Sequence, residues 1–390
     1  MITIKPPILN VENSVIRVSA ELLFPDRSER LWYEFPLKFE SYISEKLADS
    51  FLIGILPLAL KEGHDITVST AISSKLFYTV RKYLVPALCL ANPEFKNIKI
   101  TTQKTSDLDL NEGKKAGMGL SCGIDSFATF YSHLDEIAPF KIEYFTFVNA
   151  GSLGDHGGQH TRELFYSKLK QVRKFADSVN VEVIPIDSNI SELLQMNFQS
   201  THTFRNLSCI LNLQKLFKVY YYASPHRFDQ FSLNKTDSGD YDLLNIQFLS
   251  TNSLTFFSSV ANLNRIERTE FISHFSSTYN HLDVCTNSRN SGGFVNCTRC
   301  DKCLRTALTL DILGKLELYK HVFNLKIYKQ EKTKYIGKIL AQHNNEFNRE
   351  LVLFLKQSND WSSKYRVAYL KHKMKKYKSE IRKFVKSKTS

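Results

Sequence analysis

The sequence Met118-Gly-Leu-Ser-Cys-Gly-Ile-Asp-Ser126 leads directly into Phe127-Ala-Thr-Phe-Tyr131. This order of residue types predicts a short strand, a tight loop and the first turn of a helix. Backbone N–H groups at the start of a helix have no partner within the helix and carry partial positive charge. A loop of this kind can therefore hold a phosphate group.

The side chains of the loop suit a phosphate and its counterion. Gly123 lets the backbone approach an anion, and Ser121 and Ser126 supply hydroxyl donors. Asp125 can hold a magnesium ion on the phosphates. The loop has neither the Gly-Lys-Ser/Thr of a Walker A motif nor a dinucleotide fingerprint. The alternative interpretation is a Ser or Asp N-cap on an ordinary helix.

Around this loop, short apolar runs alternate with helical segments. The runs lie at 116–120, 143–148, 181–186 and 218–223. Such alternation is typical of a parallel sheet with crossover helices. We expect an α/β domain with a Rossmann-like parallel sheet, helices on both faces, and a ligand at the carboxyl ends of the strands. Residues 1–110 are predicted to form a separate α+β domain without a chemical signature.

Four of the seven cysteines form a cluster with metal-ligand spacing. Cys297, Cys300 and Cys303 make overlapping C-x-x-C pairs, and Cys285 lies twelve residues upstream of the first. Tetrahedral zinc takes four sulfur ligands, and four thiolates leave no open coordination position. The sequence therefore predicts a structural Zn²⁺ site. A redox function, an iron–sulfur cluster and chance clustering are the alternatives.

The positive charge of the chain is concentrated in its last residues. The 390 residues contain 52 Lys and Arg and 39 Asp and Glu, a net charge of +13, of which +10 falls in 361–390. The remaining +3 gives no general argument for nucleic-acid binding. In 316–390 we predict a helical region that ends in a basic amphipathic helix, with apolar side chains at Val367, Leu370, Met374, Tyr377, Ile381 and Phe384.

Three functions of the basic helix are open. It can pack on the rest of the chain or on a second copy in a homodimer, lie on an anionic membrane surface, or bind nucleic-acid phosphates. No apolar run is long enough to span a bilayer, and the N-terminus lacks the pattern of a secretory signal. We therefore expect a cytoplasmic protein, in which clustered cysteines favour a metal over disulfides.

The loop Ser121-Cys-Gly-Ile-Asp-Ser126 resembles the Ser-Gly-Gly-x-Asp-Ser motif of the PP-loop ATP pyrophosphatases, with Cys122 in place of a glycine. A PP-loop followed by four cysteines is similar to the layout of the 7-cyano-7-deazaguanine synthase (QueC-like) family. Roughly residues 114–315 are covered, and the regions before and after have no counterpart in that family. Four further segments resemble motifs of that family: Gly158-Gln-His-Thr-Arg-Glu163, Arg205-Asn206, Ser238-Gly-Asp-Tyr-Asp242 and Arg268-Thr-Glu270. The Cys-Arg that follows the third motif in the family is missing after Asp242.

This resemblance implies a HUP-type Rossmann-like fold and an ATP-dependent carbon–nitrogen ligase. Such an enzyme adenylates a carboxylate, releases pyrophosphate and forms an amide or nitrile with ammonia or another amine. A deazaguanine-type molecule is one candidate substrate. The open alternatives are a PP-loop sulfur transferase acting on tRNA and a non-catalytic nucleotide-binding protein.

The resemblance also implies which residues act. Asp125, Arg205 and His160 are the expected catalytic residues, with Arg205 neutralising phosphate or carboxylate and His160 moving a proton. ATP, with Mg²⁺, is expected to contact the loop and one residue near the adenine or ribose: Ser121, Cys122, Gly123, Ile124, Asp125, Ser126 and Asn149.

Overall fold

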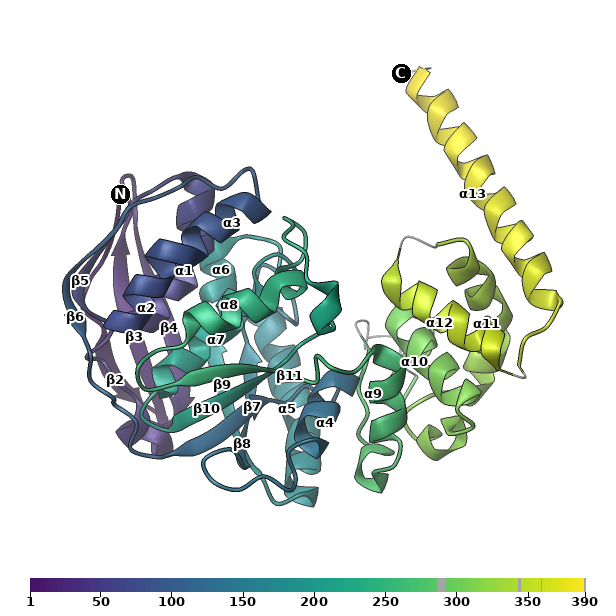
Figure 1. The fold of residues 1–390 in the computed structure, drawn as a ribbon, viewed down its shortest axis with the longest axis horizontal. Helices are drawn as coiled ribbons and strands as arrows, with labels where there is room; N and C mark the ends of the chain where they lie inside the picture. Colours follow the sequence, from purple (N-terminus) through teal and green to yellow (C-terminus); the bar gives the residue numbers. More distant parts are fainter. Residues whose placement is uncertain (286–291, 343–344, 359, 389–390) are drawn as a thin grey trace. The chain divides into compact units, whose positions relative to one another are not determined.

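The computed structural model describes residues 1–285, 292–342, 345–358 and 360–388 (Figure 1). These residues divide into two compact units. Unit 1 consists of Met1–Ser121 and Thr129–Asn262. Unit 2 consists of Cys122–Ala128 and Leu263–Ser390. The phosphate-loop candidate lies where the chain passes from the first unit to the second.

Unit 1 is built on one eleven-stranded sheet. The parallel part formed by its last five strands has the order β11-β10-β7-β8-β9. Numbered from β7, this is the order 3-2-1-4-5 of a doubly wound sheet, so the predicted α/β, Rossmann-like arrangement is confirmed. The five strands are β7 (Lys115–Gly119), β8 (Ile142–Asn149), β9 (Glu182–Ser188), β10 (Phe217–Ala223) and β11 (Thr255–Ser259).

The N-terminal strands continue the same sheet. Strand β4 pairs antiparallel with β9, which places Tyr33 opposite Ser188 and Glu34 opposite Asp187. The segment expected to be a separate domain therefore shares its sheet and its hydrophobic core with the residues after 114. These strands are β1 (Ile2–Ile4), β2 (Ile8–Glu12), β3 (Val15–Leu23), β4 (Ser28–Pro36), β5 (Ile66–Ser73) and β6 (Ile100–Ser106).

Helices cover both faces of this sheet (Figure 1). Helix α5 packs on β8 and β9 through a helical stripe of buried residues that includes Phe165, Leu169 and Val172. Helix α1 packs against α7 and is buried on nearly all sides, which explains why it is apolar all round. The helices of this unit include α1 (Asp49–Glu62), α2 (Ser74–Thr79), α3 (Val85–Ala91), α5 (Gln159–Ser178), α6 (Ile190–Leu194), α7 (His202–Ile210) and α8 (Asp242–Leu249).

Gly117 allows close packing between β7 and the adjoining strand β10. A Cβ atom on Gly117 would lie 2.5 Å from the ring of Phe217, which is fully buried and has no room to move. We expect Gly117→Ala to lower the free energy of unfolding by about 1–3 kcal/mol, as overpacking does in other cores. Gly119→Ala in the same strand is the control, because its Cβ would meet only the Tyr220 hydroxyl at 3.4 Å. Equal denaturation midpoints for the two variants would contradict this packing.

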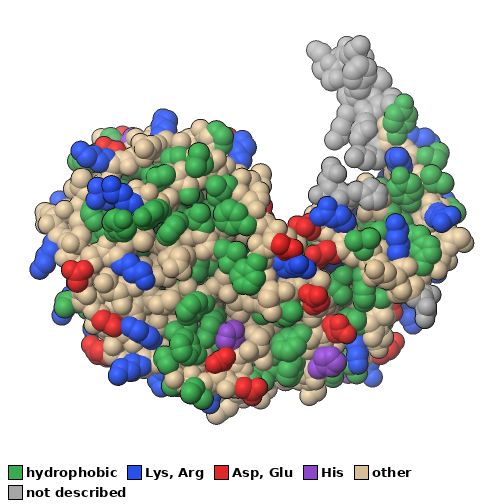
Figure 2. Space-filling view, in the orientation of Figure 1, with side chains coloured by type: hydrophobic (Ala, Val, Ile, Leu, Met, Phe, Trp, Pro, Cys, Tyr) green, Lys and Arg blue, Asp and Glu red, His purple; other side chains and the backbone are tan. Residues whose placement is uncertain are grey.

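Unit 2 is helical apart from its loops. The predicted C-terminal helix is present as α13 (Lys364–Lys388), and it packs on α11 (Leu325–Leu340) with Gly337 against Ala368. Hydrophobic and basic side chains alternate along its described part (Figure 2), and four apolar ones are exposed: Val367, Leu370, Met374 and Tyr377. Ile381 and Phe384 lie outside the described side chains. Within the described residues, no helix combines the length and the hydropathy needed to cross a bilayer.

The other helices of this unit carry the candidate site. Helix α4 (Ile124–Tyr131) begins in unit 2 directly after the loop. Helices α9 (Arg265–Ile272) and α10 (Asp301–Ile312) follow later in the chain, and α12 (Glu346–Gln357) packs on both of them. An Asn264 capping box fixes the start of α9.

Candidate functional site

The loop between β7 and α4 has an unusual backbone conformation at Cys122. Its φ is 58°, in the left-handed region that favours glycine, the residue that the resembling motif has at this position. Its carbonyl oxygen accepts a hydrogen bond from the Asp283 N–H at 2.8 Å. The Ser126 hydroxyl donates to the Gly123 carbonyl oxygen at 3.1 Å, which holds the first turn of α4.

Asp125 lies between two arginines of α9. Its Oδ2 accepts a hydrogen bond from Arg265 Nη1 at 2.8 Å, and its Oδ1 accepts one from Arg268 Nη1 at 2.7 Å. Burial acts to raise the pKa of Asp125, but the two guanidinium groups outweigh it and hold that pKa below its ordinary value. Asp125 therefore stays ionised and orients both arginines beside the loop.

Two more cations of α10 join this group. Partial burial and the nearby charges of Arg265 and Arg305 lower the pKa of Lys302. Burial is also the main reason that the pKa of Arg305 is lowered. Arg265 and Arg305 both lie over the ring of Phe347, with guanidinium carbons 5.4 and 4.7 Å from its centroid.

The resulting cluster has more positive than negative charge. Arg265 and Arg268 pair with the carboxylate of Asp125, Lys302 interacts electrostatically with that carboxylate, and Arg305 lies near Arg265. The Nε atoms of Arg265 and Arg305 are buried and have no hydrogen-bond partner among the residues that the structure describes. Buried donors without acceptors are costly, and an anion with several oxygens would supply the missing acceptors. We call these five residues the arginine cluster.

The four predicted metal ligands come together in unit 2. The sulfur atoms of Cys285, Cys297, Cys300 and Cys303 all lie within 4.8 Å of one another, and none of them forms a disulfide. Two backbone N–H groups donate to these sulfurs: Cys297 to Cys285 at 3.4 Å and Cys300 to Cys297 at 3.3 Å. Such N–H···S bonds stabilise thiolates. The donor set therefore fits a metal ion such as zinc.

The cysteine cluster is joined to the arginine cluster and to the loop. Cys300 is the N-cap of α10 and Cys303 lies in its first turn, beside Lys302. On the other side, the Cys285 N–H donates to the Asp283 side chain at 3.1 Å, and Asp283 in turn holds the Cys122 carbonyl. A metal bound by the cysteines would therefore fix both sides of the arginine cluster.

Arg205 is placed differently from what the resemblance implies. It is fully buried in unit 1, where Nη2 donates to the Met196 carbonyl at 2.6 Å and Nη1 to the Asp155 carbonyl at 2.9 Å. Nε donates to the Thr201 hydroxyl at 2.8 Å. Burial lowers its pKa to about 10, so it remains charged at neutral pH. In this structure Arg205 holds the loops around it, and its donors are directed at the chain itself.

Asn149 and His160, which the resemblance also implies as site residues, lie in unit 1 as well. Asn149, at the end of β8, donates to the Asp187 carboxylate at 2.8 Å, and Arg162 pairs with the same carboxylate at 3.2 Å. These groups sit at the carboxyl edge of neighbouring parallel strands, where doubly wound folds bind ligands. His160 is exposed in the first turn of α5.

Sequence reasoning missed three residues of the arginine cluster. Arg265, Lys302 and Arg305 were assigned no role, and Arg268 entered only as part of a motif. A signal was present in part, since Arg265 and Arg268 are three residues apart on one expected helix face, and Lys302 and Arg305 interleave with the cysteines.

In comparisons with models of protein families, with curated proteins and with solved structures, no match to this chain was found.

Proposed function

We propose that this chain is an ATP-dependent carbon–nitrogen ligase of the PP-loop type that activates a carboxylate by adenylation. The observation that carries the proposal is the arginine cluster beside the loop that enters α4. There, two buried guanidinium Nε atoms lack an acceptor within the described part of the chain. A pyrophosphate group has the charge and the oxygens to match them.

In the proposed reaction, a carboxylate oxygen attacks the α-phosphorus of ATP, and the bond from that phosphorus to the pyrophosphate oxygen breaks. Ammonia or another amine then attacks the carbonyl carbon of the acyl adenylate. AMP leaves, and the nitrogen loses a proton to give an amide. A second ATP would adenylate the oxygen of a primary amide and release a second pyrophosphate, and loss of AMP and of the two remaining nitrogen protons would give a nitrile.

The chain's own groups have distinct tasks in this scheme. The arginine cluster would stabilise the charge that develops on the leaving pyrophosphate. Ser121, Gly123 and Ser126 would bind phosphate oxygens, and Asn149 would lie near the adenine or ribose. Asp125 would help to hold Mg²⁺, which would supply neutralisation of the phosphate charge. The four cysteines would hold a structural zinc, for which the reducing cytoplasm would keep the thiols available.

The convergence of all four sulfurs favours this function over sulfur transfer. A sulfur transferase would use a C-x-x-C pair as a sulfur carrier, which requires thiols free to react. Here the two overlapping pairs and Cys285 point to one centre. A bound metal would occupy every sulfur. The basic helix α13 remains a candidate surface for an anionic partner.

Exchange of labelled pyrophosphate into ATP tests the proposal directly. With Mg²⁺ and a panel of carboxylates that includes deazaguanine acids, we expect exchange that depends on one class of carboxylate and needs no amine. Adding ammonia should then convert the exchange into net AMP release. Tight ATP binding without exchange would instead support a non-catalytic nucleotide-binding protein. No affinity for ATP, or AMP release that requires sulfide and tRNA, would refute the ligase.

A further inference from the structure

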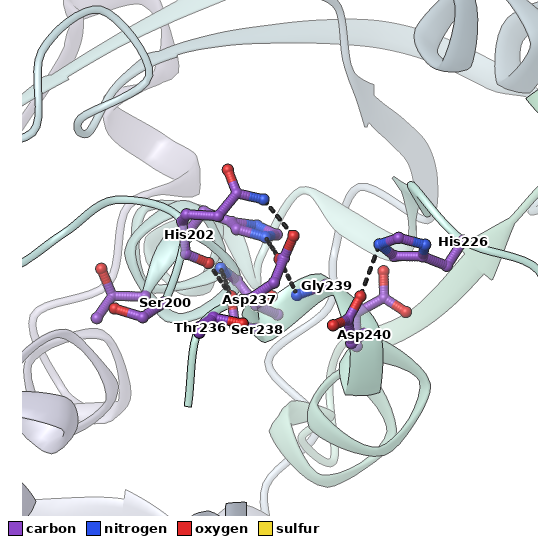
Figure 3. Close-up of polar contacts among 12 residues, drawn as sticks. Ser200, His202, His226, Thr236, Asp237, Ser238, Gly239 and Asp240 are labelled. Carbon is purple, nitrogen blue, oxygen red and sulfur yellow. Dashed lines mark hydrogen bonds and ion pairs between the residues drawn. The ribbon is translucent and has the colours of Figure 1, made fainter. Parts of the chain in front are cut away.

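Three metal-binding side chains meet in unit 1, away from the loop and from the four cysteines in sequence. They are His226, which follows β10, and Asp237 and Asp240 at a 3-10 turn, Ser238–Tyr241 (Figure 3). His226 Nε2 lies 2.8 Å from Asp240 Oδ1. One donor atom from each of the three side chains lies within 4.8 Å of the other two. Nothing in the ligase proposal uses this group.

We propose that His226, Asp237 and Asp240 form a binding site for a divalent transition-metal ion such as Mn²⁺. One imidazole nitrogen and two carboxylate oxygens suit Mn²⁺, Fe²⁺ and Zn²⁺. Three protein ligands leave coordination positions for water or a further ligand. The inference stands on this geometry alone and does not depend on the proposed ligase.

The carboxylates are held in place by neighbouring donors, as ligands in metal sites usually are. Asp237 Oδ1 accepts from the Gly239 N–H at 2.8 Å and lies 3.2 Å from His202 Nε2. The other ring nitrogen of His202 lies 2.6 Å from the Tyr222 hydroxyl, which fixes the orientation of that imidazole. Figure 3 shows both histidines pointing at the carboxylates of the turn.

Asp240 is oriented in the same way. Its Oδ2 accepts a hydrogen bond from Asn234 Nδ2 at 2.5 Å, which leaves Oδ1 directed toward His226. The turn itself is fixed because Asp237 caps it through the Gly239 N–H. The carboxylate oxygens are thus held in position by hydrogen bonds from the backbone and from neighbouring side chains, in addition to their contacts within the group.

The charge around the group also favours a cation. Asp242 is buried just beyond the turn, and its carboxylate accepts from the Ser224 hydroxyl at 2.9 Å. Among the residues that the structure describes, Asp237 and Asp240 form ion pairs with histidines, and neither pairs with a lysine or arginine. Histidine is therefore the only basic residue type that pairs with Asp237 and Asp240 in the described part of the chain. A divalent ion would balance this charge.

Titration of the zinc-loaded, nucleotide-free protein with Mn²⁺, followed by the electron paramagnetic resonance signal of free Mn²⁺, tests the proposal. Mn²⁺ is the probe because thiolate sites disfavour it. We expect saturable binding of about one Mn²⁺ per chain. His226→Gln and Asp240→Asn should each weaken it by roughly 100-fold or more, since loss of even a supporting partner costs about 10–100-fold.

One control separates this site from other binding. Asp229→Asn removes an exposed carboxylate of the same segment that pairs with Arg227, and it should leave Mn²⁺ affinity unchanged. Each variant is checked for its thermal unfolding midpoint, which Mn²⁺ should raise in the parent and in Asp229→Asn but not in His226→Gln.

Two results would overturn the site: absence of saturable Mn²⁺ binding, or Mn²⁺ binding that is unaffected by both His226→Gln and Asp240→Asn. Should either ligand variant fail to fold, His202→Gln gives the second measurement. It removes a group that supports Asp237, and we expect about 10–100-fold weaker Mn²⁺ binding. Unchanged affinity in His202→Gln would then refute the proposal.

Discussion

Cys303→Ser is expected to lose the bound metal and to unfold much of unit 2. Cys303 is fully buried, and its sulfur lies 3.3 Å from that of Cys300 and 3.8 Å from that of Cys297. A structural zinc site contributes about 10 kcal/mol or more to folding, because the ligands are brought together only in the folded chain. Zinc content, helical circular dichroism and limited proteolysis of the purified variant measure the effect.

The same variant should also lose ATP binding, although Cys303 would not touch the nucleotide. The Asp283 backbone N–H holds the carbonyl of Cys122, and Asp283 is followed two residues later by the metal ligand Cys285. The first turn of α10 carries Lys302 next to Cys303. Loss of the metal therefore releases both the loop and a cation of the arginine cluster. Chelation of zinc from the parent protein should reproduce the result.

Cys89→Ser is the matched control, since Cys89 is partly exposed in α3 of unit 1 and belongs to no cluster. It should keep the metal, the helical signal and the ATP affinity of the parent. The structural role of the cysteines would be wrong if Cys303→Ser retained stoichiometric zinc and the parent's unfolding midpoint. It would also be wrong if zinc were lost while unit 2 remained protected from protease.

Local patterns in the sequence were enough to predict the parallel strands and the grouping of the four cysteines. The runs at 116–120 and 143–148 correspond to β7 and β8, since buried parallel strands are continuously apolar. The overlapping C-x-x-C pairs need only one short segment to place three sulfurs together. In each case the determining residues lie close together along the chain.

The pairing of β4 with β9 could not be predicted, because it joins Tyr33 to Ser188 across more than 150 residues. No local pattern specifies which edge of a sheet a distant strand will meet. The interior position of Arg205 was also missed. An arginine whose donors are all taken by backbone carbonyls and hydroxyls has the same local sequence as one that faces a ligand. Only the fold distinguishes the two.

The contacts of the arginine cluster could not be predicted from local sequence either, and they lead to a second prediction, on activity. Asp125 and Arg265 are separated by 140 positions, and nothing in the phosphate-loop motif says which cations will meet its aspartate. Arg265→Gln is expected to reduce the efficiency of pyrophosphate exchange by about 10²–10³-fold, the usual effect of removing one preorganised donor from a developing anion. Pyrophosphate should also inhibit this variant less than it inhibits the parent.

Folding should be far less affected than catalysis in Arg265→Gln. Its side chain is 21% exposed, and Arg268, whose side chain is 1% exposed, still pairs with Asp125. The control Arg349→Gln removes an exposed arginine of α12 that pairs with Glu346, and it should behave as the parent in both assays. Arg265→Lys should be more active than Arg265→Gln but less active than the parent, since an ammonium group keeps the charge but cannot form bidentate hydrogen bonds.

Comparison of the pyrophosphate-exchange rate with the unfolding midpoint shows whether the arginines act in catalysis or only neutralise Asp125. If they stabilise the leaving pyrophosphate, the exchange rate falls steeply in Arg265→Gln while the unfolding midpoint moves little. If they serve only to neutralise Asp125, the unfolding midpoint falls together with the activity, and Asp125→Asn combined with Arg265→Gln restores the midpoint, because the partly buried charge is removed together with its partner. A midpoint that falls in Arg265→Gln and recovers in the double variant would therefore contradict a catalytic arginine cluster. Only the midpoint of the double variant is compared, because Asp125 is itself proposed to hold Mg²⁺.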